Sequence, residues 1–226
     1  MKNQFIGLFA ICFVLTSCTK QELVAPAVNL VNVNLLAGDS NFLEIIKQEK
    51  QLTHFISQLA NEKGLTIIEL KNKLNDLHNK DLNSGSGDQI LYAYLGTKYI
   101  NLIKDLANTY RINYNHVSKR YGPLTIMQVD TAVKQVYKNE YRLSLENTRS
   151  IDMIATNALL EVNKEKDCGW KYALCIAGAT SAAIFCHIGC IGSTAGIGAP
   201  VCVLLCGTIQ AAAGVVCIDN YCPIPE

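Results

Sequence analysis

The sequence predicts an all-α protein, in which an amphipathic helical body is followed by a small, disulfide-rich antiparallel helical hairpin. Apolar residues recur at helical spacing through residues 41–166. Eight of the ten cysteines lie between Cys168 and Cys222, at spacings that read almost the same in both directions. The centre of this palindrome, residues 191–201, contains three glycines and a proline, which are turn signals.

The first residues are typical of an export signal. Lys2 precedes an apolar run over residues 5–15, which ends in Leu15-Thr16-Ser17-Cys18. This ending resembles the lipobox of bacterial lipoproteins, which implies cleavage before Cys18 and lipid on its sulfur. Thr19 follows in place of Asp, which is similar to lipoproteins sent on to the outer membrane or cell surface. We therefore expect residues 1–17 to be a lipoprotein signal peptide. An ordinary signal peptide or a short membrane anchor is the alternative.

Residues 18–40 are predicted to tether the lipid to the body, because the stretch 23–38 carries no charge. A short strand within it is the alternative. The body, residues 41–166, is expected to form four or five helices with ordinary amphipathic faces. Gly64 is expected to end the first of them, and Thr66 with Glu69 makes a capping box for the next.

The later helices of the body are bounded by similar signals. Asp88 is expected to cap a third helix that continues as far as Leu106. The segment Tyr121-Gly122-Pro123 breaks the chain again. Two further helices are expected, one around Val133 and one over residues 153–162.

Nothing in the body indicates catalysis. His54, His78 and His116 stand singly among polar neighbours. The sequence has no Gly-rich phosphate loop, no nucleophile elbow and no HExxH motif. The formal net charge is only +1, which gives no reason to expect a nucleic-acid partner. We expect no enzymatic activity, no cofactor and no metal.

The cysteine spacing favours one of the 105 pairings that eight cysteines allow. Steps of 4 and 11 residues keep cysteines on one face of a helix. Folding the chain back at residues 191–201 then brings them together in nested pairs. Cys12 leaves with the signal and Cys18 carries lipid, so an even number remains in an oxidising compartment. The predicted pairs are Cys190–Cys202, Cys186–Cys206, Cys175–Cys217 and Cys168–Cys222.

A zinc site is the alternative use of these cysteines. Cys186, Cys190, Cys202 and Cys206 would form a Cys₄ cage. Export to an oxidising compartment and the four symmetric pairs favour disulfides. His187 points about 100° away from Cys186 around a helix, so we expect it at solvent or at an interface and not on a metal.

Hydropathy predicts that the hairpin interacts with membranes. The 47 residues from Tyr172 to Ile218 contain no Asp, Glu, Lys or Arg. A helix over residues 172–192 would be about 31 Å long, close to the hydrocarbon thickness of a bilayer. An aromatic and basic collar is expected at the open end. Its members are Trp170, Lys171, Tyr172 and Tyr221. The alternative is a cross-linked domain that is stable in water, and a soluble but membrane-active hairpin reconciles the two.

Three motifs resemble a known family. They are Lys171-Tyr172-Ala173, Cys186-His187-Ile188-Gly189-Cys190 and Gly196-Ile197-Gly198-Ala199-Pro200-Val201. Together they resemble the cysteine-rich domain of halocin-type bacteriocins, the microhalocins. The resemblance implies a disulfide-rich antimicrobial peptide that is released from a larger precursor and acts on the envelope of competing cells. It also implies that the N-terminal part of the precursor can confer immunity.

The chain departs from that family in three respects: its domain has fewer cysteines, a lipoprotein signal precedes it, and its helical middle resembles no known family. We expect residues 167–226 to be a bacteriocin-like peptide for defence against bacteria, with residues 41–166 as its carrier or immunity partner. Lys164-Glu165-Lys166-Asp167 is a plausible cleavage segment. The expected partner is a lipid bilayer. The alternative function is a surface lipoprotein whose cysteine-rich end is a binding or structural module.

Overall fold

A computed structural model of the chain describes residues 30–85, 88–147, 169–193 and 199–222. All regular elements in these ranges are α-helices, so the predicted all-α class is confirmed. In chain order they are α2 (Leu30–Ala37), α3 (Ser40–Glu62), α4 (Ile67–Ser84), α5 (Gln89–Leu95), α6 (Thr97–Tyr121), α7 (Ile126–Asn147), α9 (Gly169–Ser193) and α10 (Ala199–Tyr221).

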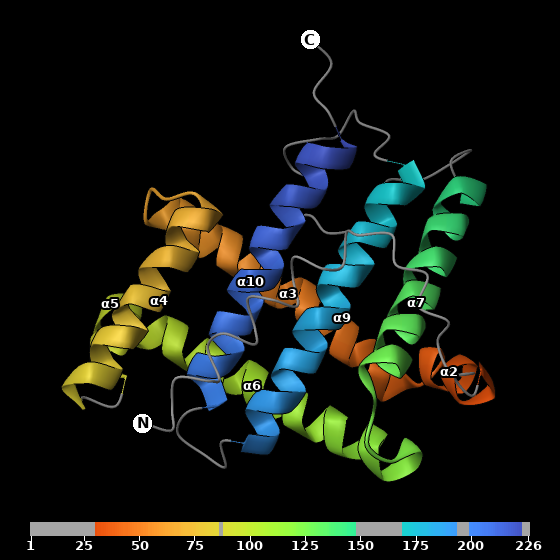
Figure 1. Cartoon of the computed structure of the whole chain (residues 1–226), viewed down its shortest axis with the longest axis horizontal. Helices are drawn as coiled ribbons and strands as arrows, with labels where there is room; N and C mark the ends of the chain where they lie inside the picture. The colour runs from red at the N-terminus through yellow and green to blue at the C-terminus, as the bar shows by residue number, and fades with distance from the viewer. Residues whose placement is uncertain (1–29, 86–87, 148–168, 194–198, 223–226) are drawn as a thin grey trace.

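The helices form two layers (Figure 1). Helices α4, α10, α9 and α7 lie side by side in the first layer, with the antiparallel α9–α10 hairpin at its centre. Helices α3 and α6 cross behind them and form the second layer. The hairpin is therefore covered on both flanks and on one face by helices of the polar body.

The hydrophobic core is shared between the hairpin and the body. Leu204 and Cys206 of α10 are buried together with Leu52 and Ile56 of α3. In a second cluster, Ile184 of α9 is buried with apolar side chains of α3 and α7. The division predicted near residue 167 is thus one of composition and charge, whereas the described residues on its two sides are packed together.

Several helix boundaries follow local signals in the sequence. The Thr66 hydroxyl accepts the Glu69 N–H at 3.2 Å, and the Glu69 carboxylate accepts the Thr66 N–H at 2.8 Å, so the predicted capping box is confirmed. Gly64 has φ +64°, a left-handed conformation that glycine adopts without strain, directly after the end of α3. Helix α6 ends at Tyr121, before Gly122, as predicted.

The prediction of one helix from Asp88 to Leu106 is wrong. Gly96, with φ +83°, separates the short α5 from the long α6. Asp88 does not cap α5 with its side chain, and its carboxylate instead pairs with His78 at 3.0 Å. The cap comes from Asp81 at the end of α4, which accepts the N–H groups of the first turn of α5 at 2.8 Å.

The predicted tether contains a folded helix. Val33 and Leu36 of α2 are buried against α7, which stabilises this short helix although its sequence is not amphipathic. Asp39 then accepts the N–H groups of Asn41 and Phe42 and caps α3. Residues 18–29 of the predicted tether, the signal peptide with Cys12, and the helix predicted over residues 153–162 lie outside the described residues, and so does Cys18.

Candidate functional site

Disulfides join the two helices of the hairpin along its length. Cys175–Cys217, Cys186–Cys206 and Cys190–Cys202 are bonded, with Cα–Cα distances of 5.7, 5.9 and 5.7 Å. These are three of the four predicted pairs. Cys222 is also disulfide-bonded. Its predicted partner, Cys168, lies outside the described residues.

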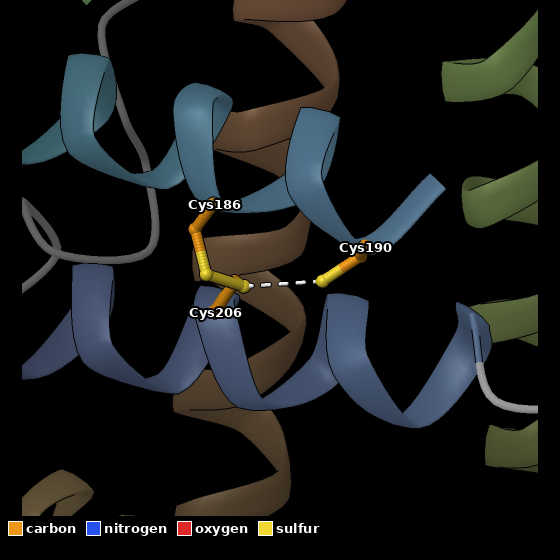
Figure 2. Close-up of side chains that lie close together, drawn as sticks. All are labelled: Cys186, Cys190 and Cys206. Atoms are coloured by element: carbon orange, nitrogen blue, oxygen red, sulfur yellow. Dashed lines mark hydrogen bonds between the residues drawn. A yellow bond between two sulfur atoms is a disulfide. The ribbon is translucent and has the colours of Figure 1, made fainter. Parts of the chain in front are cut away.

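Two of the disulfides are close together near the closed end. Figure 2 shows the first, Cys186–Cys206, with Cys190 of the second beside it. Cys190 Sγ lies 3.5 Å from Cys206 Sγ, and the sulfur atoms of Cys186, Cys190 and Cys206 all lie within 4.8 Å of one another. Zinc binds cysteine as the thiolate. In this structure the same sulfur atoms are bonded in pairs and cross-link α9 to α10, which is the disulfide arrangement that the spacing favours.

The hairpin exposes an uncharged apolar surface. Phe185 on α9 is 37% exposed and Val216 on α10 is 49% exposed, and Ala182 is also exposed. Both helices are long and apolar enough to cross a membrane, over Gly169–Ile191 and Pro200–Tyr221. Such helices also occur in the cores of soluble proteins, and here one face of each packs against the body.

The predicted collar lies at the open end of the hairpin, where α9 begins and α10 ends (Figure 1). Trp170 is 46% exposed, Tyr221 is 39% exposed, and Lys171 is exposed as well. Tyr172 differs from the other three, because it is half-buried. Three of the four predicted residues are therefore accessible for contact with a polar–apolar boundary.

A buried polar contact connects the hairpin to the body. His187 was expected at solvent or at an interface; it is fully buried, and it lies at the interface between α9 and the body. Its Nδ1 is 2.6 Å from Glu49 Oε1 on α3, and Glu49 is buried too. Its Nε2 is 3.0 Å from the carbonyl oxygen of Val203 on α10.

The hydrogen bonds fix the position of one proton on the imidazole. A carbonyl oxygen only accepts, so His187 Nε2 must donate to Val203. One further proton then lies between Nδ1 and the Glu49 carboxylate. With that proton in place the pair is neutral overall, either as imidazolium and carboxylate or as imidazole and carboxylic acid.

Tyr110 of α6 closes the third side of this contact. Its ring meets the His187 ring edge-on, with centroids 5.1 Å apart, and its hydroxyl donates to the carbonyl oxygen of Ile184 at 3.2 Å. Burial, and then the nearby Glu49 carboxylate, raise the pKa of Tyr110 well above its ordinary value. The phenol therefore stays protonated and remains a donor.

A second polar contact lies nearer the open end. The Thr180 hydroxyl of α9 is 3.1 Å from the Tyr137 hydroxyl of α7, and it accepts from Gln210 Nε2 of α10 at 3.2 Å. All three side chains are buried. This contact holds the hairpin against α7 through neutral groups only.

Close backbone approach completes the interface. A Cβ atom on Gly207 of α10 would lie 2.5 Å from Leu52 Cδ2 and 2.9 Å from Ile56 Cδ1 of α3. Only glycine fits here without displacement of those side chains. The absence of a side chain at this position lets α10 lie directly on α3.

The residues of the buried pair left a partial signal in the sequence. Glu49 occurs at helical spacing between Ile45 and Leu52 or Thr53, on the face that is otherwise apolar. A carboxylate on such a face requires a buried partner. The identity of that partner was not predictable, because His187 lies 138 residues away in the chain.

Two of the other histidines have local partners. His54 contacts Gln58 one turn away, at 2.9 Å, and His78 pairs with Asp88. Neither contact includes a Ser, Thr or Cys nucleophile.

Comparison of the chain with protein-family models, with curated protein sequences and with solved structures found no match.

Proposed function

We propose that the chain is an exported, lipid-anchored precursor of a membrane-active antimicrobial hairpin. Residues 167–226 are the active part, and residues 41–166 carry it. The observation that carries the proposal is the pair of long apolar helices, α9 and α10, which are cross-linked by disulfides and packed against a polar helical body. The lipobox at Cys18 and the resemblance to halocin-type bacteriocins support the same function.

The hairpin has the properties that membrane insertion requires. Its backbone polar groups are bonded within two helices, so they need no water in a hydrocarbon environment. Residues 172–218 carry no Asp, Glu, Lys or Arg, so the only titratable side chain whose charge burial would oppose insertion is that of His187. The disulfides keep α9 and α10 paired when they leave the body.

The body has the properties of a cover. Helices α3, α4, α6 and α7 present apolar faces to the hairpin and polar faces to water. They reduce the apolar surface that an exported chain would otherwise expose, and a large patch of that kind promotes aggregation. A carrier of this kind keeps the hairpin soluble until it is released.

The test uses the oxidised chain with a specific protease site placed within residues 164–167. Vesicles of phosphatidylethanolamine and phosphatidylglycerol are loaded with a fluorescent dye. We expect dye release from the cut, oxidised chain, little release from the uncut chain, and little from a cut chain whose disulfides have been reduced. No release from the cut chain, or equal release by its oxidised and reduced forms, contradicts the proposal.

The alternative is a surface lipoprotein whose cysteine-rich end is structural. The shared hydrophobic core favours this function, because burial of α10 against α3 and α4 is typical of one cooperative fold. It predicts that only the intact chain is found, on the cells. Mass spectrometry of the culture medium separates the two functions, because a precursor yields a fragment from residues 167–226 and a structural lipoprotein does not.

A further inference from the structure

We infer that the Glu49–His187 pair is a latch, a contact that keeps the hairpin docked on the body and whose loss releases it. This inference deepens the proposed function and depends on it only for the consequence at a membrane. Glu49 belongs to α3 and His187 to α9, so the pair connects the carrier to the hairpin. In the described part of the chain, no other ion pair of the structure joins these two parts.

The first argument is burial. Both side chains are removed from water, so each is costly without the other. Glu49 Oε2 is buried and has no hydrogen-bond partner among the described residues, and the nearby Tyr110 phenol interacts with the same carboxylate without carrying a charge. The contact of Oε1 with His187 is therefore the charged part of its compensation. Loss of the His187 contact therefore leaves the carboxylate without charged compensation inside the protein.

The second argument concerns what happens when the shared proton leaves. Without it, the His187 Nδ1 lone pair faces the Glu49 carboxylate, and the two repel each other. The interface then holds an unpaired negative charge. Separation of α9 from α3 relieves this state, because the carboxylate regains water and the hairpin carries away a neutral imidazole.

The third argument concerns the groups around the pair. Tyr110 from α6 is a protonated phenol, Val203 from α10 offers only a backbone carbonyl, and Tyr137 from α7 is buried and bonded to Thr180. None of these carries a charge that replaces that of His187. Lys50 follows Glu49 in α3, but its ammonium is bonded to Glu140 on the surface at 2.9 Å.

The fourth argument is that detachment suits a membrane-active hairpin. After separation Glu49 stays on the body, so no carboxylate travels with residues 172–218. His187 is the one titratable side chain in that stretch besides tyrosine and cysteine, and it enters a bilayer neutral once its proton is lost. When the latch opens, the carboxylate of Glu49 therefore stays on the body and does not enter the bilayer with the hairpin.

The test compares the full, oxidised wild-type chain with Glu49→Gln and His187→Gln. The matched control is Glu140→Gln, which breaks the Lys50–Glu140 pair between α3 and α7 without touching the Glu49–His187 contact. The readout in water is solvent exchange of the His187 Nε2–H proton by NMR, because that proton exchanges only when the interface opens. We expect exchange about tenfold to a hundredfold faster in Glu49→Gln and unchanged in Glu140→Gln.

Loss of overall stability must be separated from release. Val129→Ala, at a fully buried site of α7, lowers stability without touching the pair. At matched global stability, faster exchange in Glu49→Gln than in Val129→Ala supports the latch. Equal exchange in the two variants overturns it, and if Glu49→Gln fails to fold, the same comparison is made with Glu49→Asp.

Vesicle leakage then tests the consequence independently. We expect uncut Glu49→Gln and His187→Gln chains to release dye about tenfold faster than the wild type, and Glu140→Gln to behave as the wild type. If the interface opens in Glu49→Gln but neither this variant nor the cut wild type causes leakage, the latch stands and the proposed function fails. If the cut wild type causes leakage and the Glu49 and Glu140 variants are alike in exchange, the function stands and the latch fails.

Discussion

Glu49 and His187 show how a single residue in an apolar face can determine how two parts of a chain dock. A buried charge pair contributes little net stability compared with apolar residues of the same size, yet removal of one partner is costly. The pair therefore acts mainly on specificity: it fixes α9 at one position on α3, where only one arrangement satisfies both charges. The pair and its neighbours Val203 and Tyr110 lie on four different helices, far apart in the chain, which is why the sequence did not reveal the contact.

A double-mutant cycle measures this contact. Each single variant, Glu49→Gln and His187→Gln, is expected to lower the free energy of unfolding by about 3 kcal/mol, because it leaves a buried polar group unpaired. The double variant is expected to lose less free energy of unfolding than the sum of the two single losses, by at least about 1 kcal/mol. Urea unfolding of the oxidised chain gives these values. Additive losses would show that the two side chains do not interact.

The surroundings of Asp39 predict that the stability of the fold depends on pH. Burial acts to raise the pKa of Asp39, but the N–H groups of Phe42 and Asn41, then Tyr121 and Arg120, together hold it below its ordinary value. A lowered folded pKa gives stability that is present above about pH 4, the unfolded value, and is lost as the pH falls through the folded value.

The variant Asp39→Asn isolates that effect, since asparagine still caps a helix. It is expected to lose about 1 kcal/mol at pH 7 and less near pH 3, where the wild type has begun to lose the same charge. Asp130→Asn, which breaks the exposed contact with Lys134, is the control and should change stability by less than about 0.5 kcal/mol at both pH values. A constant difference between wild type and Asp39→Asn from pH 7 to pH 3 would contradict the argument.

At the scale of elements, the helices and their cross-links were predictable because their signals are local. The spacing of the cysteines predicts that α9 and α10 pair antiparallel. Three of the predicted disulfides are present: Cys175–Cys217, Cys186–Cys206 and Cys190–Cys202. One helix boundary, at Gly96, and one whole helix, α2, were missed for physical reasons. A lone glycine such as Gly96 is tolerated inside a helix, and α2 owes its stability to burial against α7.

Gly207 gives a prediction for the crossing of α10 over α3. Gly207→Ala places a methyl group 2.5 Å from Leu52 Cδ2 and 2.9 Å from Ile56 Cδ1, which is closer than van der Waals contact. We therefore expect the free energy of unfolding to fall by about 1–3 kcal/mol. Gly178→Ala on α9, where a Cβ meets nothing within 4 Å, should be neutral or stabilising by up to about 1 kcal/mol. Thermal unfolding of the two variants makes the comparison. A neutral Gly207→Ala would show that the two helices are not in close contact there.

The innermost disulfide gives a second prediction at this scale. Replacing both Cys190 and Cys202 by serine removes a link with a sequence separation of 12, which is expected to cost about 3 kcal/mol or less, because the outer disulfides already restrain the chain. Under the zinc alternative the same variant abolishes metal binding. Mass spectrometry of the native wild type, which should show a gain of about eight hydrogens on reduction and no metal, distinguishes the two.

At the scale of the whole molecule, the sequence predicted two parts that differ in charge, and the structure packs these parts together. The helical hairpin occupies the centre of the first layer, between α4 and α7 and on top of α3 and α6 (Figure 1). Periodicity predicts that each helix has an apolar face, but it does not state which other helix that face meets. The covering of the hairpin by the helical body became visible only in three dimensions.

The chain contains a single tryptophan, Trp170, which lies at the open end of the hairpin, so its fluorescence reports on the hairpin alone. The most direct test of a hairpin that acts on membranes is quenching of Trp170 by brominated lipids, before and after the chain is cut within residues 164–167. We expect strong quenching and a blue-shifted emission after the cut, and little change before it. Emission that is unaffected by the lipids in the cut, oxidised chain would contradict the account.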